Sequence, residues 1–184
     1  MKRVRKAVIP AAGMGTRFLP ATKSMPKEML PIIDTPVLQF VIDEAVASGI
    51  EDILIVTGRG KRAIENHLDY NPELESFLRD TGKESLIEQM RDIGDKCEIF
   101  YIRQKVQRGL GDAINLARAH VGDEPFAVLL GDTIIDVPEG EPAGLKQCAD
   151  VFEAKQASVV AVRHVPREWT SRYGIVDGTP DRDN

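Results

Sequence analysis

A glycine-rich loop near the amino terminus is the part of the sequence best suited to chemistry. The run AVIPAAGMGTRFLPATKSMPKEMLP (7–31) opens as an apolar strand and then breaks at Gly13 and Gly15. Glycines allow backbone N–H groups to approach an anion closely. Arg17 and Lys27 follow in the same loop and would neutralise that anion. The pattern predicts a site for the phosphates of a nucleotide.

Two common phosphate-binding motifs do not fit this loop. A Walker A loop has a glycine, four residues and then Gly-Lys-Ser/Thr, and that spacing is absent. A dinucleotide fingerprint has a third small residue three positions after its second glycine. This chain has the bulky Phe18 there, and Pro20 then prevents an immediate helix. An NAD-dependent oxidoreductase is therefore disfavoured.

The elements that must position this loop alternate between strand and helix patterns. Such alternation is typical of an α/β fold with a mainly parallel sheet, and 184 residues suit a single domain over 1–184. The run 126–130 is the most apolar and is expected to be a central strand, buried on both faces. A first helix is expected from Pro36, capped by Asp34 or Thr35, to a stop at Gly49. The other predicted strands are 7–9, 53–56, 97–102 and 158–162, and the other predicted helices are 61–70, 73–94 with a break near Gly82, 111–121 and 143–156.

Composition excludes several classes of function. The net charge is −5, from 29 acidic and 24 basic residues without a long basic run, which argues against a nucleic-acid surface. No run approaches the roughly 20 apolar residues of a membrane span, and the start is too broken for a signal peptide. We therefore expect a cytoplasmic protein that binds neither nucleic acid nor membrane. Two reduced thiols, Cys97 and Cys148, are expected, and His67, His120 and His164 lack the spacing of a metal site or triad.

Polar clusters follow three of the predicted strands. They are 11–17, 103–112 (RQKVQRGLGD) and the pair Gly131-Asp132. Because ligands of a parallel sheet gather outside the carboxyl ends of its strands, these clusters should meet at one edge. A carboxylate there suits Mg²⁺, which predicts Asp132 as a metal ligand, with Asp136 as a possible assistant. The basic run TGRGKR (57–62) is expected to be a solvated turn and helix start.

The full run GMGTRFLPATKSMPKEMLP resembles the signature loop of the sugar nucleotidyltransferases. Its PATKSMPKEMLP part is similar to the prokaryotic UTP–glucose-1-phosphate uridylyltransferases, and the resemblance extends from Val4 to Val176. It implies a Rossmann-like, three-layer α/β domain of the glycosyltransferase-A-like kind. It also implies Mg²⁺-dependent transfer of a uridylyl group from UTP to glucose 1-phosphate, which gives UDP-glucose and pyrophosphate.

The resemblance assigns roles to individual residues. Gln104 would read uracil, because an amide both donates and accepts, and the backbone of Gly109 would approach the same edge of the base. Gly174, in the segment YGIV, would approach the sugar. Glu28 would lie near the nucleotide, where it needs a cation or a hydroxyl beside it. The implied catalytic residues are Arg17, Lys27 and the metal ligand Asp132, and the implied nucleotide-binding residues are Ala11, Ala12, Gly13, Gly15, Thr16, Glu28, Gln104 and Gly109.

Members of this family continue well beyond the position of Asn184. The resemblance implies that the further part carries ligands for glucose 1-phosphate, a second metal-binding aspartate and helices for self-association into a homo-oligomer. We expect the 184-residue chain to bind UTP but to turn over poorly. Two alternatives stay open: a thymidylyltransferase acting on the same sugar phosphate, because the phosphate loop does not touch the base, and a non-catalytic nucleotide sensor.

Overall fold

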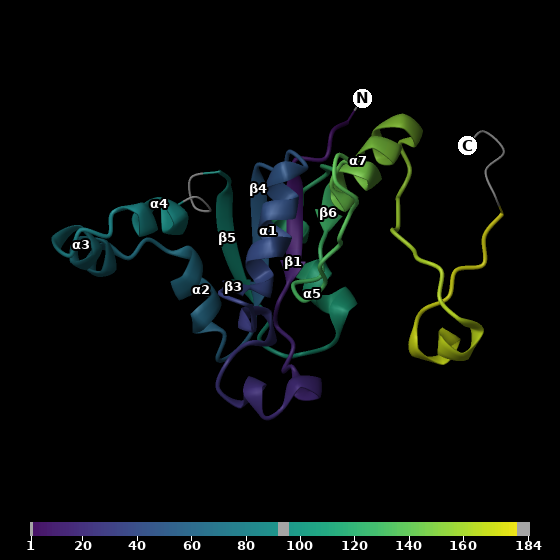
Figure 1. The fold of residues 1–184 in the computed structure, drawn as a ribbon. Helices are drawn as coiled ribbons and strands as arrows, with labels where there is room; N and C mark the ends of the chain where they lie inside the picture. The colour runs from purple at the N-terminus through teal and green to yellow at the C-terminus, as the bar shows by residue number, and fades with distance from the viewer. Residues whose placement is uncertain (1, 92–95, 180–184) are drawn as a thin grey trace.

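A computed structural model of the chain describes residues 2–91 and 96–179. Its centre is a four-stranded parallel sheet in the order β5-β4-β1-β6 (Figure 1). In this register Val8 of β1 lies between Leu54 of β4 and Val128 of β6, and Leu54 pairs on its other side with Phe100 of β5. The strands are β1 (Lys6–Pro10), β4 (Asp52–Thr57), β5 (Glu98–Arg103) and β6 (Phe126–Val128).

Helices cover both faces of the sheet. Side chains alternate along a strand, so β1 and β4 present apolar residues to each face. One face packs against α1 (Val37–Ala47), α2 (Arg62–Leu68) and α7 (Gly144–Lys155). The other packs against α5 (Leu110–Leu116) and α6 (Arg118–Val121). The three-layer α/β arrangement expected from the sequence is therefore confirmed.

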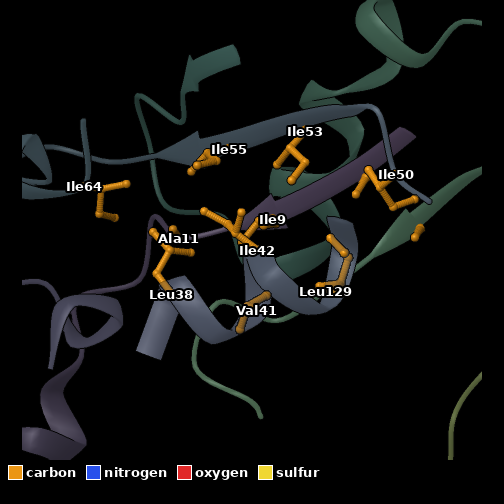
Figure 2. Packing of buried hydrophobic residues seen from close by; sticks show 13 residues of the cluster. Ile9, Ala11, Leu38, Val41, Ile42, Ile50, Ile53, Ile55, Ile64 and Leu129 are labelled. Carbon is orange, nitrogen blue, oxygen red and sulfur yellow. The ribbon is translucent and has the colours of Figure 1, made fainter. Parts of the chain in front are cut away.

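The main core lies between the sheet and α1. Figure 2 shows Ile9, Ile53 and Ile55 of the strands facing α1, which contributes Leu38, Val41 and Ile42. Each of these six side chains is at most 1% exposed. Their burial holds α1 against the two central strands, β1 and β4.

The start of α1 differs from the prediction. Pro36 precedes the helix instead of forming its first turn, and no side chain caps the helix there. The reason is a short antiparallel hairpin formed by β2 (Pro31–Ile32) and β3 (Thr35–Pro36), which places the expected caps in a strand and a turn. The predicted stop at Gly49 is confirmed, because Gly49 has a φ of +87° and its N–H donates to the Val46 carbonyl at 3.0 Å.

Two strand predictions were wrong. The run 126–130 lies at the edge of the sheet, β6 ends at Val128, and the side chains of Val128 and Leu130 are more than 40% exposed. The run 158–162 is not a strand and is largely exposed. Apolar and β-branched composition favours a strand. It does not supply a neighbouring strand for hydrogen bonding, and it does not decide whether a strand lies at the centre or the edge of the sheet.

Two helices, α3 (Pro72–Asp80) and α4 (Ser85–Arg91), extend beyond the β5 edge of the sheet (Figure 1). They confirm the predicted break near Gly82, whose φ is +69°, while the expected end of this helical region falls outside the described residues. Four 3₁₀ turns complete the fold: η1 (Thr16–Phe18), η2 (Ala21–Lys23), η3 (Lys27–Met29) and η4 (Arg167–Arg172). Among the described helices, none has the length and apolar character needed to cross a membrane.

Shortening a core side chain tests this packing. Ile42→Ala should lower the free energy of unfolding by about 2–5 kcal/mol, because it removes buried apolar atoms and leaves a cavity. Urea unfolding would measure the change. The matched control is Ile175→Ala, at a side chain that is 57% exposed, which should change stability by less than about 0.5 kcal/mol. Equal losses from both variants would contradict this description of the core.

Candidate functional site

The loops that follow the sheet strands meet at one edge of the sheet. Residues after β1 form the loop at the lower end of the sheet in Figure 1. Hydrogen bonds continue the ladder into these loops: Ala11 N–H donates to the Val56 carbonyl at 2.9 Å, and Gln104 N–H donates to the Thr57 carbonyl at 2.8 Å. The convergence expected of the three polar clusters is thus present.

The phosphate-binding loop predicted from the sequence folds back on itself. Gly15 has a φ of +68°, and an added Cβ would lie 3.1 Å from Thr22 Cγ2 and 3.2 Å from Lys27 Cβ. The Thr22 hydroxyl donates to the Gly15 carbonyl at 2.8 Å. A side chain at position 15 would therefore be strained and crowded, which explains the glycine. Ala11 and Ala12 are buried beneath the loop, while Gly13 lies exposed.

The phosphate-binding loop and the third cluster are joined by an ion pair. Lys27 Nζ lies 2.6 Å from Asp132 Oδ2, although the two residues are 105 positions apart. Their side chains are 19% and 25% exposed, so the pair is sheltered yet open to a ligand. A lysine that is paired with a carboxylate beside a glycine loop can still donate hydrogen bonds to phosphate oxygens, because its ammonium has three N–H groups.

A second ion pair is buried behind the first. Glu28 is fully buried, and its Oε2 accepts a hydrogen bond from Lys61 Nζ at 2.8 Å. The side chain of Lys61 is only 7% exposed. The other carboxylate oxygen, Glu28 Oε1, has no partner among the described residues. Lys61 is the cation that the sequence analysis required beside Glu28, and it ties η3 to the turn after β4.

The prediction for the basic run 57–62 was therefore wrong at Lys61, which is buried instead of solvated. Gly58 in the same run is also part of the site, because an added Cβ would lie 2.9 Å from the Ala12 carbonyl oxygen. A signal for both was present in the sequence. The run follows an apolar strand, so the rule that predicted three clusters at the sheet edge applies to this fourth one as well.

The second cluster supplies an amide that is held from one side. Gln104 is 5% exposed, and its Nε2 donates to Asp112 Oδ2 at 2.8 Å and to the Gly109 carbonyl at 3.3 Å. Gln107 Nε2 donates to the Ala12 carbonyl at 2.6 Å, which links this cluster to the phosphate-binding loop. Neither Gln107 nor Asp112 was singled out from the sequence, because amides and carboxylates in loops carry no special spacing.

Three other predicted residues lie in the open. Thr16 and Arg17 form part of η1 and are exposed, and no described residue pairs with the Arg17 guanidinium. Gly174 lies in the exposed segment after α7, which runs apart from the sheet in Figure 1. The structure therefore brings Lys27, Glu28 and Asp132 together but does not bring Gly174 to them.

The cysteines and two of the histidines show no sign of a catalytic or metal-binding role. Cys97 and Cys148 are free thiols, as expected, and burial raises the pKa of both, which makes them poor nucleophiles. His67 contacts Gln39, and burial lowers its pKa. His120 Nε2 lies 2.7 Å from Asp52 Oδ1. Within residues 2–91 and 96–179 no cluster of three or more His, Cys, Asp or Glu side chains could hold a metal ion by itself.

Breaking the buried ion pair should be costly. Lys61→Met would leave the Glu28 carboxylate buried without its cation, and should lower the free energy of unfolding by about 3–5 kcal/mol. The double variant Glu28→Gln/Lys61→Met should lose less than Lys61→Met alone, because the uncompensated charge is removed. Chemical denaturation of the wild type, the single variants and the double variant would measure this coupling.

The matched control is the exposed helical ion pair of Lys146 and Asp150. Lys146→Met should cost less than about 1 kcal/mol, since exposed pairs contribute little. A Lys61→Met variant no less stable than Lys146→Met would show that the buried pair does not stabilise η3.

Comparisons with known proteins agree with this geometry. A family model described as nucleotidyl transferase matches residues 6–183. A Bacillus subtilis protein named UTP–glucose-1-phosphate uridylyltransferase is 58% identical over 177 residues, which cover 96% of this chain and 60% of that relative. The chain thus spans about 60% of the length of the curated relatives it matches.

Solved structures show the same similarity. A UDP-glucose pyrophosphorylase complexed with UDP-glucose is 43% identical, with a TM-score of 0.84 over 96% of this chain and 63% of that one. A UTP-bound UGPase from Acinetobacter baumannii is 38% identical, with a TM-score of 0.91 over 98% of this chain and 64% of that one. With its parallel sheet, glycine loop and paired Lys27 and Asp132 at the strand ends, the chain belongs to the nucleotidyl transferase family.

Proposed function

We propose that this chain carries the nucleotide-binding part of an enzyme that transfers a uridylyl group from UTP to glucose 1-phosphate. The observation that carries the proposal is the ion pair between Lys27 and Asp132 at the mouth of the glycine loop. The pair brings a cation and a carboxylate together beside the glycine loop, which supports a site for the phosphates of a nucleotide and a metal ion. The names of the similar proteins, which include UTP, UDP-glucose and glucose 1-phosphate, support the choice of substrates.

The reaction needs no nucleophilic side chain. A phosphate oxygen of glucose 1-phosphate forms a bond to the α-phosphorus of UTP. The bond from that phosphorus to the oxygen bridging to the β-phosphate breaks, and pyrophosphate leaves with the electron pair. The absence of a reactive thiol among the described cysteines fits this chemistry. Catalysis then consists of alignment and of reducing the repulsion between two anions.

Lys27 and Arg17 would supply the positive charge from the protein. Lys27 is held by Asp132 in a sheltered position, and Arg17 is exposed on η1 with no described partner. Incoming phosphate oxygens would compete with Asp132 for the Lys27 ammonium. The glycine loop, with Ala11, Ala12 and Gly13 to Thr16, would offer its backbone beside them.

The residues present fit a Mg²⁺ ion that is bound together with a nucleotide. Asp132 is a single carboxylate, and Mg²⁺ commonly takes one or two carboxylates plus phosphate oxygens and water. When bound, Mg²⁺ would reduce the charge of the triphosphate and orient it. We therefore propose Asp132 as the metal ligand. Asp136 is exposed four residues later.

Gln104 and the Gly109 backbone would face the base. The approach of Gly174 to the sugar stays a prediction from the sequence. A thymidylyltransferase is the second candidate, because thymine presents the same imide edge as uracil. Self-association and a cytoplasmic location also stay predictions from the sequence.

Pyrophosphate release from UTP, glucose 1-phosphate and Mg²⁺ tests the proposal, on this chain and on any longer form, with UTP binding measured in parallel. Release that falls when dTTP replaces UTP would support the uridylyltransferase. Equal or greater release with dTTP would favour the thymidylyltransferase. UTP binding without release from either form would favour a nucleotide sensor. A failure of UTP to bind would refute the nucleotide site.

Lys27→Met should lower turnover by about 100- to 1000-fold in the active form, because it removes a cation from the charge that develops on the phosphates. Steady-state kinetics would measure this change. Lys23→Met, at an exposed lysine of the same loop, is the control and should leave turnover nearly unchanged. Similar losses in both variants would show that Lys27 acts only through the general charge of the loop.

A further inference from the structure

The Gln104 side-chain amide can take only one orientation in this structure. Its Nε2 faces the Asp112 carboxylate at 2.8 Å and the Gly109 carbonyl at 3.3 Å. A carboxylate and a carbonyl have acceptor oxygens and no hydrogen to donate. A flipped amide would bring its own oxygen against both, which is repulsive. The Gln104 Oε1 is therefore turned away from them, and no described residue donates a hydrogen bond to it.

The backbone around Gln104 holds this arrangement rigidly. Gly109 has a φ of +99°, and its carbonyl also accepts the Ala113 N–H at 3.2 Å at the start of α5. Asp112 lies in the first turn of that helix, so its carboxylate is placed by the same turn. On the other side, the Gln104 N–H is bound to Thr57 at the end of β4. Gln104 and Asp112 together line a cavity of about 420 Å³.

The orientation of an amide decides which base edge it can pair with. Uracil and thymine present an N3–H donor at the centre of their pairing edge, whereas cytosine presents a bare N3 acceptor and an exocyclic amine. A fixed Gln104 Oε1 accepts the N3–H of an imide. The same oxygen placed against cytosine N3 would meet a second acceptor, and a polar group that loses its partner on binding costs free energy.

We propose that Asp112 is a positioning residue that fixes the Gln104 amide with its oxygen toward the base and thereby selects uracil or thymine over cytosine. The inference rests on the proposed function, because it takes Gln104 to face the base. Asp112 acts through Gln104 and touches no reacting atom. The competing explanation is that Asp112 only stabilises the amino-terminal turn of α5, as an acidic residue does at that position.

Asp112→Asn separates the two explanations. The variant keeps the shape of the side chain, but its amide can donate as well as accept. Only the longer contact with the Gly109 carbonyl, at 3.3 Å, then still favours one orientation of the Gln104 amide. Binding of UTP, dTTP and CTP to the 184-residue chain with Mg²⁺ is measured by calorimetric titration. We expect the preference for UTP over CTP to fall by about tenfold, the orienting effect of one hydrogen bond to a charged group. The ratio of UTP to dTTP should not change, because both bases present the same imide.

Ratios are the right measure because removing a negative charge strengthens the binding of every nucleotide triphosphate alike. Asp123→Asn, at an exposed position, removes the same charge and should leave both ratios unchanged. Asp112→Glu keeps an acceptor-only group and should retain the preference for UTP over CTP. Thermal unfolding of each variant reports any loss of α5 stability separately.

The outcomes distinguish this inference from the proposed function. An unchanged ratio of UTP to CTP in Asp112→Asn, with the wild type binding UTP well, would overturn the positioning role and leave the function standing. An equal loss of preference in Asp112→Asn and Asp112→Glu would also overturn it, since the acceptor would then not matter. A wild-type chain that binds neither UTP nor dTTP would overturn the proposed function itself.

Discussion

Parallel pairing of β1 with β4 and β6 is the constraint on which the site depends. Because every pairing in this sheet runs in the same direction, the chain leaves each strand at the same edge. Residues about 100 positions apart then come within hydrogen-bond distance, as Lys27 and Asp132 or Gln107 and Ala12 do. The apolar side chains occupy both faces under the helices, which leaves polar groups at the strand ends.

The two ion pairs at this edge of the sheet differ in burial and therefore in what they can do. The pair of Glu28 and Lys61 is almost completely buried, so salt and ligands compete little for it, and it links the backbone beside the phosphate-binding loop to the turn after β4. The pair of Lys27 and Asp132 is partly exposed, so an anion could replace Asp132 beside the Lys27 ammonium, and a cation could replace Lys27 beside the Asp132 carboxylate. An acidic protein can in this way present cations to an anionic ligand, because the charge that matters is local.

Much of this architecture could be predicted from the sequence. Short apolar runs and apolar residues at helical spacing predicted the α/β alternation, and the parallel-sheet rule predicted the convergence of the three polar clusters. The same reasoning failed at 158–162, which forms no strand, and it placed the strand at 126–130 in the centre of the sheet instead of at its edge. It also failed at Lys61, because charged residues in a turn are ordinarily solvated, and only a buried carboxylate from a distant segment reverses that expectation.

The sequence by itself determined most of the helices and strands around the site and which residue types could bind a phosphate. Glycines at strand ends, a lysine after a proline and an aspartate after an apolar run act through short-range sterics and charge. The tertiary structure alone decided which of these groups meet. Burial pairs Glu28 with Lys61, and the turn after Gly109 sets Asp112 against Gln104, because contacts between distant segments depend on the order and packing of strands and helices and not on spacing along the chain.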